Sequence, residues 1–383
     1  MPTTNFKISV DDSVIDKLKD RLANTRYPDE ITGSDWNYGT NLSYLKELVQ
    51  YWQTTFDWPK QQALINSFSH FLTTVDDIKI HFIHEKGKGP SPLPLIITHG
   101  WPGTFFEMYK IIPMLTDPQR FGGDPKDSFD IVVPSIPGYG FSEAFHNRGL
   151  DALSVADMWA KLMSENLGYM KFGAQGGDWG ARVTAKLGLS HGDKVVGIHT
   201  TSTTSPTPYL GEGTRELSGS EERMLQQREN WVQYEGGYSH IQSTKPQTLS
   251  YSLNDSPAGL AAWIVEKYRT WSDCGGDIET RFTKDELLTT ITIYWVTESI
   301  GSSIRLYYES LNKPWNLAKG ELIDVPVAVA AFPHENTVPL REWAERSYNV
   351  QHWTDMPSGG HFAALEEPDR LVRDVRDFFR SLR

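Results

Sequence analysis

The feature that most constrains the fold is a series of short apolar segments separated by stretches with helical periodicity. The apolar segments are residues 95–97, 131–133, 172–174, 195–198, 325–332 and 349–353. Short apolar strands that alternate with helices are typical of a parallel sheet buried on both faces. The pattern therefore predicts an α/β fold with a mostly parallel central sheet. Apolar positions at helical spacing in residues 371–382 predict a closing C-terminal helix.

The stretch before residue 172 is the clearest of the predicted helices. Val155, Trp159 and Leu162 recur at helical spacing and form one apolar face. Ser154 is the predicted N-cap, and Gly168 lies where a left-handed residue ends a helix. This segment supports alternation of strands and helices beyond what composition indicates.

The chain divides into four predicted regions. Residues 1–86 read as an independent extension with two amphipathic helices, an irregular meander and a half-buried strand over 78–82, in which Lys79 and His81 alternate with apolar residues. Residues 87–205 and 319–383 are the two parts of the α/β core. Residues 206–318 lack strand alternation and are rich in Trp and Tyr, which predicts an inserted helical lid.

Composition excludes several classes of function. The 383 residues contain 37 Lys and Arg against 49 Asp and Glu, a net charge of −12, which is unlike a nucleic-acid-binding protein. The single cysteine, Cys274, allows neither an intramolecular disulfide nor a CxxC site, so a cytoplasmic location is expected. We find no signal peptide, membrane anchor, HExxH motif or nucleotide fingerprint, and expect no metal or cofactor.

A candidate nucleophile lies directly after the strand at 172–174. Gly176-Gly-Asp-Trp-Gly180 places Asp178 between small residues, and a helix follows. This arrangement matches the strand–turn–helix elbow G-x-nucleophile-x-G, with aspartate in place of serine. A surface turn would explain the motif equally well, because Asp and Gly are common turn residues.

Three further segments fall in register with this elbow. His99-Gly-Trp-Pro102 follows the first core strand, so the N–H groups of Trp101 and Trp179 are candidates for an oxyanion hole. Glu335 follows the strand at 325–332, and His361 comes after the last strand and two glycines. The order nucleophile, acid, histidine is that of the α/β-hydrolase fold.

Longer motifs carry a family resemblance from about residue 6 to the C-terminus. They include His99-Gly-Trp-Pro-Gly-Thr-Phe-Phe-Glu107, Gly237-Tyr-Ser-His-Ile-Gln-Ser-Thr-Lys-Pro246 and Gly359-Gly-His-Phe-Ala-Ala-Leu-Glu-Glu-Pro368, together with residues 18–26, 176–180 and 253–262. On these residues the chain resembles the microsomal-type epoxide hydrolases of the α/β-hydrolase superfamily. It departs from them in lacking an N-terminal hydrophobic anchor.

The resemblance implies a set of roles in the conversion of an epoxide and water to a diol. It implies that Asp178 is the nucleophile, His361 the base and Glu335 its orienting acid. It also implies two lid tyrosines that bind the epoxide oxygen, and these map onto Tyr238 and Tyr307. The second assignment leaves Tyr308 as an alternative, because it is adjacent.

Two rival functions stay open. A haloalkane dehalogenase also uses an Asp-Trp elbow, but halide release favours indole or amide donors, whereas an epoxide oxygen favours phenols. A binding protein that kept the hydrolase fold without turnover is the second alternative. The natural substrate, its stereochemistry, the biological role and assembly into a homo-oligomer are not predicted by the sequence.

Overall fold

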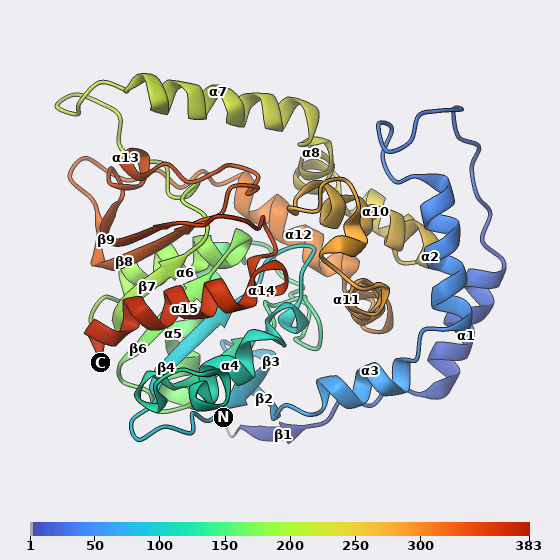
Figure 1. The fold of residues 1–383 in the computed structure, drawn as a ribbon, viewed down its shortest axis with the longest axis horizontal. Coiled ribbons are helices and arrows are strands. Elements are labelled where there is room, and N and C mark those ends of the chain that lie inside the picture. Colours follow the sequence, from blue (N-terminus) through green and yellow to red (C-terminus); the bar gives the residue numbers. More distant parts are fainter. Residues whose placement is uncertain (1–2) are drawn as a thin grey trace.

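The computed structural model describes residues 3–383, which form one nine-stranded sheet beside a group of helices (Figure 1). The strand order is β1-β2-β3-β5-β4-β6-β7-β8-β9. Strands β4–β9 are parallel, and β1–β3 extend the sheet in antiparallel pairing. Their bounds are β1 Thr4–Phe6, β2 His70–Val75, β3 Ile78–Glu85, β4 Leu93–Thr98, β5 Phe129–Pro134, β6 Phe172–Gly176, β7 Val195–Thr200, β8 Ile323–Ala331 and β9 Tyr348–Asp355. The predicted α/β fold with a mostly parallel sheet is confirmed.

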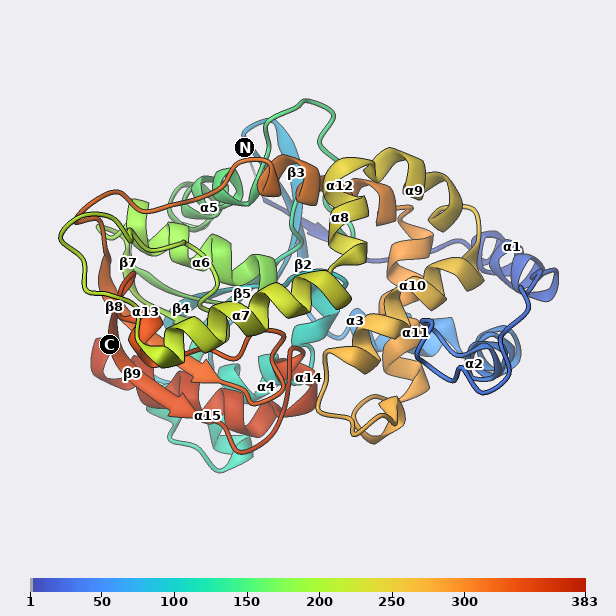
Figure 2. The ribbon, with the colours of Figure 1, turned by 90° about the horizontal axis from the view of Figure 1, so that it is seen from above.

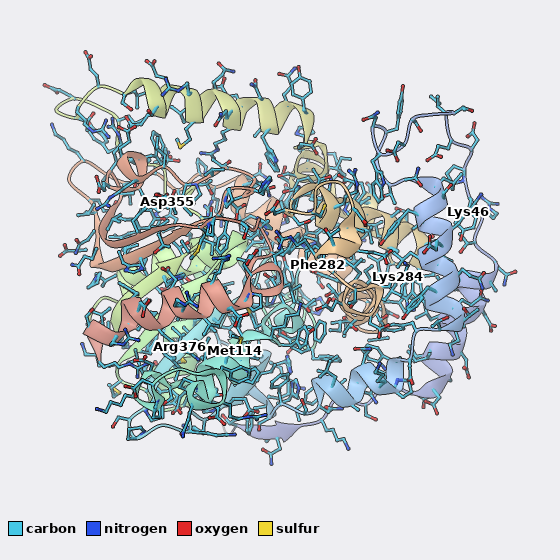
Figure 3. All side chains as sticks on the ribbon, in the orientation of Figure 1. Lys46, Met114, Phe282, Lys284, Asp355 and Arg376 are labelled. Carbon is cyan, nitrogen blue, oxygen red and sulfur yellow. The ribbon has the colours of Figure 1, made fainter. Side chains whose placement is uncertain are left out.

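Helices cover both faces of this sheet. Figure 2 shows α5 (Ala152–Lys161) and α6 (Asp178–Ser190) on one face and α4 (Ile111–Thr116) and α15 (Pro368–Phe379) on the other. Helix α15 buries its apolar stripe and also ties the layer together, because Arg376 donates a hydrogen bond to the carbonyl of Met114 in α4 (Figure 3). Two short helices, α13 (Arg341–Ala344) and α14 (Ala363–Glu366), flank the last strand.

Six helices between β7 and β8 form the segment predicted as a lid. They are α7 Gly219–Tyr234, α8 Gly237–Thr244, α9 Pro246–Leu253, α10 Pro257–Thr270, α11 Lys284–Val296 and α12 Ile300–Leu311. Helix α12 packs on α8 and α9, whereas α7 lies along the outside of the molecule (Figures 1 and 2). The first turn of α7 is held by Glu221, whose carboxylate accepts hydrogen bonds from Arg215 and Arg346.

The N-terminal helices pack against this helical group. They are α1 Asp12–Ala23, α2 Leu42–Thr54 and α3 Trp58–Ile65. Trp52 in α2 donates from its indole N–H to Thr292 Oγ1 of α11 over 3.1 Å. Lys284, at the start of α11, pairs with Glu47 at 2.9 Å. Within residues 3–383, no helix combines the length and the apolar character needed to span a bilayer.

Two details of the sequence interpretation are wrong. His81 is fully buried rather than exposed on a half-buried strand, because its ring bonds His70 of β2 and Ser135 after β5 and packs against Phe105 and Phe141. The N-cap of α5 is Asp151, whose carboxylate accepts from the N–H of Ser154 three residues later. A third expectation is also wrong: β1–β3 belong to the common sheet, so residues 3–86 are not structurally independent of the core.

Candidate active site

Asp178 begins α6 directly after β6 and has a backbone φ of +49°. Left-handed conformations are unfavourable for side chains with a Cβ, so the surrounding structure must hold this turn. It does so by close packing, because a Cβ on Gly180 would overlap the carbonyl of Thr98, and one on Gly176 would overlap the backbone of Gly180. The turn therefore projects the Asp178 carboxylate above the C-terminal edge of the sheet.

The turn after β4 meets this carboxylate from the other side. The N–H of Trp101 donates to Asp178 Oδ1 over 2.8 Å, and a Cβ on Gly100 would overlap the Asp178 side chain. Trp179 is the residue after Asp178, and both residues line one cavity. Two N–H groups are predicted to form an oxyanion hole, and one of them, that of Trp101, already donates a hydrogen bond to the Asp178 carboxylate.

His361 lies between two carboxylates. Its Nδ1 is 2.6 Å from Glu335 Oε1, and its Nε2 is 3.5 Å from Asp178 Oδ2. Burial alone would lower the pKa of His361, but the negative charges of Glu335 and Asp178 outweigh burial and raise it well above its usual value. The loops after β8 and β9 therefore bring Glu335 and His361 into line with Asp178, which follows β6.

Two tyrosines from the lid segment face this line. Tyr238 is in the first turn of α8 and stacks on the Trp101 ring at 5.4 Å, while Tyr307 of α12 meets the same ring edge-on at 5.8 Å. Tyr307 is 3% exposed, whereas its neighbour Tyr308 is 45% exposed. Burial raises the pKa of both Tyr238 and Tyr307, so both phenols stay protonated at neutral pH.

These groups share a cavity of about 390 Å³. Asp178, Trp179, Tyr238, Tyr307, Glu335 and His361 all line it. A carboxylate on one wall and two neutral O–H donors on the other suit attack at a carbon whose leaving oxygen needs a proton. The imidazole beside the carboxylate can activate water in a second step.

Glu366 was not singled out by the sequence interpretation. Its buried carboxylate accepts the N–H groups of Gly360 and Phe362, on either side of His361, at 3.0 and 2.9 Å. It also accepts the N–H of Asp273 at 2.8 Å, and the Trp271 carbonyl accepts the His361 N–H at 2.9 Å. The sequence does contain a signal for this role, because Glu366 directly follows the apolar run at 362–365. A charged side chain on a buried segment needs hydrogen-bond partners.

Glu107 is a second acidic group that the motifs contained without explaining. Its carboxylate lies against Gly103, where a Cβ would overlap it. Burial raises its pKa to about 8, and His361 opposes that rise. A neutral carboxyl thus lies near the histidine at neutral pH.

Comparison with known proteins places the geometry in a family. Residues 3–108 match the family described as "Epoxide hydrolase N terminus", and residues 94–243 match the "alpha/beta hydrolase fold" family. The chain is 41% identical to epoxide hydrolase 1 of Oryctolagus cuniculus, over 97% of this chain and 88% of the relative.

Solved structures give the same result. The juvenile hormone epoxide hydrolase of Bombyx mori has a TM-score of 0.88 at 30% identity, over 99% of this chain and 94% of that one. The epoxide hydrolase of Aspergillus niger has a TM-score of 0.87 at 29% identity, over 100% and 97% of the two chains. With near-complete coverage by such relatives, the chain belongs to the epoxide hydrolase family of the α/β-hydrolase superfamily and is an enzyme that acts on an epoxide and water.

Proposed function

We propose that this epoxide hydrolase works through a covalent ester on Asp178. In the first step, a carboxylate oxygen of Asp178 attacks an epoxide carbon, the carbon–oxygen bond of the ring breaks, and an alkyl ester forms. Tyr238 and Tyr307 hold the departing oxygen and supply its proton. A carboxylate is already ionised at neutral pH and needs no base, whereas the alkoxide needs an acid.

In the second step, His361 accepts a proton from water, and the resulting hydroxide attacks the ester carbonyl of Asp178. Glu335 holds the imidazole in orientation and stabilises its protonated form. The N–H groups of Trp101 and Trp179 receive the oxyanion. The ester then breaks at the acyl bond, releasing the diol and restoring the carboxylate. The proton that His361 took up replaces the one that the tyrosine gave up, so the phenol is restored.

Charge couples the two steps. The carboxylates of Asp178 and Glu335 raise the pKa of His361 in the free enzyme. Esterification removes the negative charge of Asp178, so the pKa of His361 falls when a base is required. The observation that carries the proposal is this placement of His361 between Glu335 and Asp178, across one cavity from two buried phenols.

The experiment measures diol formation from styrene oxide by the wild type and by Asp178→Asn. We expect diol only from the wild type, and a single turnover in heavy-oxygen water should label Asp178 before the diol. An unlabelled Asp178 would contradict the covalent step. Bromide release from 1,2-dibromoethane, measured in parallel, tests the dehalogenase alternative, and bromide without diol would overturn the proposal.

Three further expectations accompany this proposal. We infer a cytoplasmic location from the single, buried Cys274, and cell fractionation checks this inference. Size-exclusion chromatography reports whether the chain forms a homo-oligomer.

We also propose the boundaries 1–86, 87–205, 206–318 and 319–383, with the first region clamping the lid segment. Limited proteolysis tests these boundaries, since cleavage is expected near residues 86, 205 and 318.

A further inference from the structure

The cavity that contains Asp178 is also lined by two arginines, Arg182 and Arg228. The other charged or titratable residues along its wall are the two tyrosines and the residues of the catalytic line. The mechanism above uses neither arginine. An arginine that is paired with a carboxylate of the protein has a structural role, whereas an unpaired arginine is available to a ligand. We therefore consider the partners of each arginine in turn.

Arg182 lies one helical turn after Asp178 on α6 and is half-buried. Its Nη2 donates to the carbonyl of Lys313 at 3.2 Å, and its guanidinium lies 5.9 Å from the centre of the Trp315 ring. Its Nε is buried and has no hydrogen-bond partner among residues 3–383.

Asp151 does not neutralise Arg182. Asp151 raises the pKa of Arg182, but burial lowers it by more. Moreover, Asp151 is already the N-cap of α5 and pairs with Lys313 at 3.4 Å. No ion pair joins Arg182 to a carboxylate within the described part of the chain.

Arg228 has still fewer partners. It lies on α7, on the same helix face as Trp231 and Val232, which also line the cavity. In the part of the chain that the structure describes, its guanidinium forms no hydrogen bond, ion pair or cation–π contact, although the residue is half-buried. The one buried acid of α7, Glu221, is occupied by Arg215 and Arg346.

A half-buried guanidinium without a counter-charge is unfavourable, because burial removes part of its hydration. Burial accordingly lowers the pKa of Arg228, with no opposing charge. The planar group matches a carboxylate, which can accept two parallel hydrogen bonds from it. Two such cations along one substrate cavity are thus arranged for an anion rather than for a neutral hydrocarbon.

We propose that the substrate is an epoxide that carries a carboxylate, bound by Arg228 and Arg182 at the side of the cavity formed by α6 and α7. The inference rests on the proposed function, because it assigns a second half to the same substrate. Asp178 and Arg182 are separated by about 6 Å along the axis of α6. The cavity of about 390 Å³ has room for a carboxylate and an epoxide joined by a short carbon chain.

The test compares a terminal epoxyhexanoate with its primary amide, which has the same length and lacks the charge. The wild type should show a kcat/KM about tenfold higher for the acid, as expected for one hydrogen-bonded ion pair. Arg228→Gln should reduce this ratio about tenfold, chiefly by raising KM for the acid. Arg228→Lys, which keeps the charge but loses the paired donors, should fall between the two.

Arg223→Gln is the matched control. Arg223 lies on the same helix but is exposed, bonds Ser220 and does not line the cavity. The ratio of acid to amide should be the same in this variant as in the wild type.

The outcomes separate the two proposals. Turnover of the amide with no preference for the acid contradicts the carboxylate inference and leaves epoxide hydrolysis standing. A ratio that Arg228→Gln does not change contradicts the assignment to Arg228. Failure of the wild type to hydrolyse the acid, the amide and styrene oxide contradicts the proposed function, and the inference with it.

Discussion

The two walls of the cavity are built differently. The wall at the sheet edge consists of strand ends, where backbone hydrogen bonds and close glycine contacts fix Asp178 and His361. The opposite wall consists of helices α7, α8 and α12, which present Tyr238, Tyr307 and Arg228. Backbone contacts thus fix the positions of the catalytic residues on the sheet wall. On the helical wall, the side chains alone determine the shape and the charge of the cavity. Substrate selectivity should therefore change more readily on the helical wall than on the sheet wall.

The largest expected effect is on the sheet wall. His361→Gln should reduce steady-state turnover about 10²–10⁴-fold, because ester hydrolysis loses its base. Attack by Asp178 does not use the imidazole as a base, so the ester should accumulate. Intact-mass spectrometry after mixing with styrene oxide checks this, and absence of an adduct would argue against His361 as the base.

The tyrosines test the helical wall. Tyr238→Phe and Tyr307→Phe should each slow ester formation about 10²-fold, since each removes a donor to the departing oxygen. Stopped-flow tryptophan fluorescence resolves this step because the rings of Trp101 and Trp179 contact Tyr307. Tyr308→Phe is the control, since its side chain is exposed, and a loss as large as that of Tyr307→Phe would overturn the assignment.

Glu366 tests whether backbone contacts position the catalytic base on the sheet wall, because its carboxylate bonds only backbone N–H groups there. Glu366→Gln removes part of the acceptor for three N–H groups and should slow ester hydrolysis about tenfold more than ester formation. Rapid-quench measurement of both steps gives the two rates. Glu367→Gln is the matched neighbour, because its carboxylate binds side chains of Ser358 and Arg281 instead. Equal slowing of both steps by Glu366→Gln would indicate general loss of structure.

The smallest effect concerns the attachment of α7. Burial alone would raise the pKa of Glu221, but hydrogen bonds from Arg346 and Arg215 lower it to about 2. Glu221→Gln should reduce the free energy of unfolding by about 1–2 kcal/mol at pH 7. A lowered carboxylate pKa stabilises the fold above about pH 4.5 and loses this effect as the pH falls towards 2. Urea unfolding at pH 7 and pH 3 should therefore show a smaller difference from wild type at pH 3.

The sheet wall was largely predictable from sequence, because its residues follow strands whose apolar pattern is local. Asp178, Glu335 and His361 each come directly after such a strand or its loop. On the helical wall, Ile300, Ile304 and Tyr307 share one helix face, so periodicity could have separated Tyr307 from Tyr308.

The remaining features depend on contacts between distant segments. The burial of His81 depends on contacts with His70, Phe105 and Phe141, which residues 78–82 do not encode. The roles of Glu366 and of the arginines likewise depend on which backbone or cavity lies opposite. Asp151 rather than Ser154 caps α5 because two residues with similar capping preference lie in one turn.

The bond from the His361 N–H to the Trp271 carbonyl, just after α10, has a consequence for the traffic of molecules through the enzyme. An opening that moved the end of α10 would carry the catalytic base away from the ester that it must hydrolyse. Epoxide and diol should therefore pass on the side of α7. Where release of the diol limits the rate, substitutions that accelerate turnover are to be sought along α7 and not along α10.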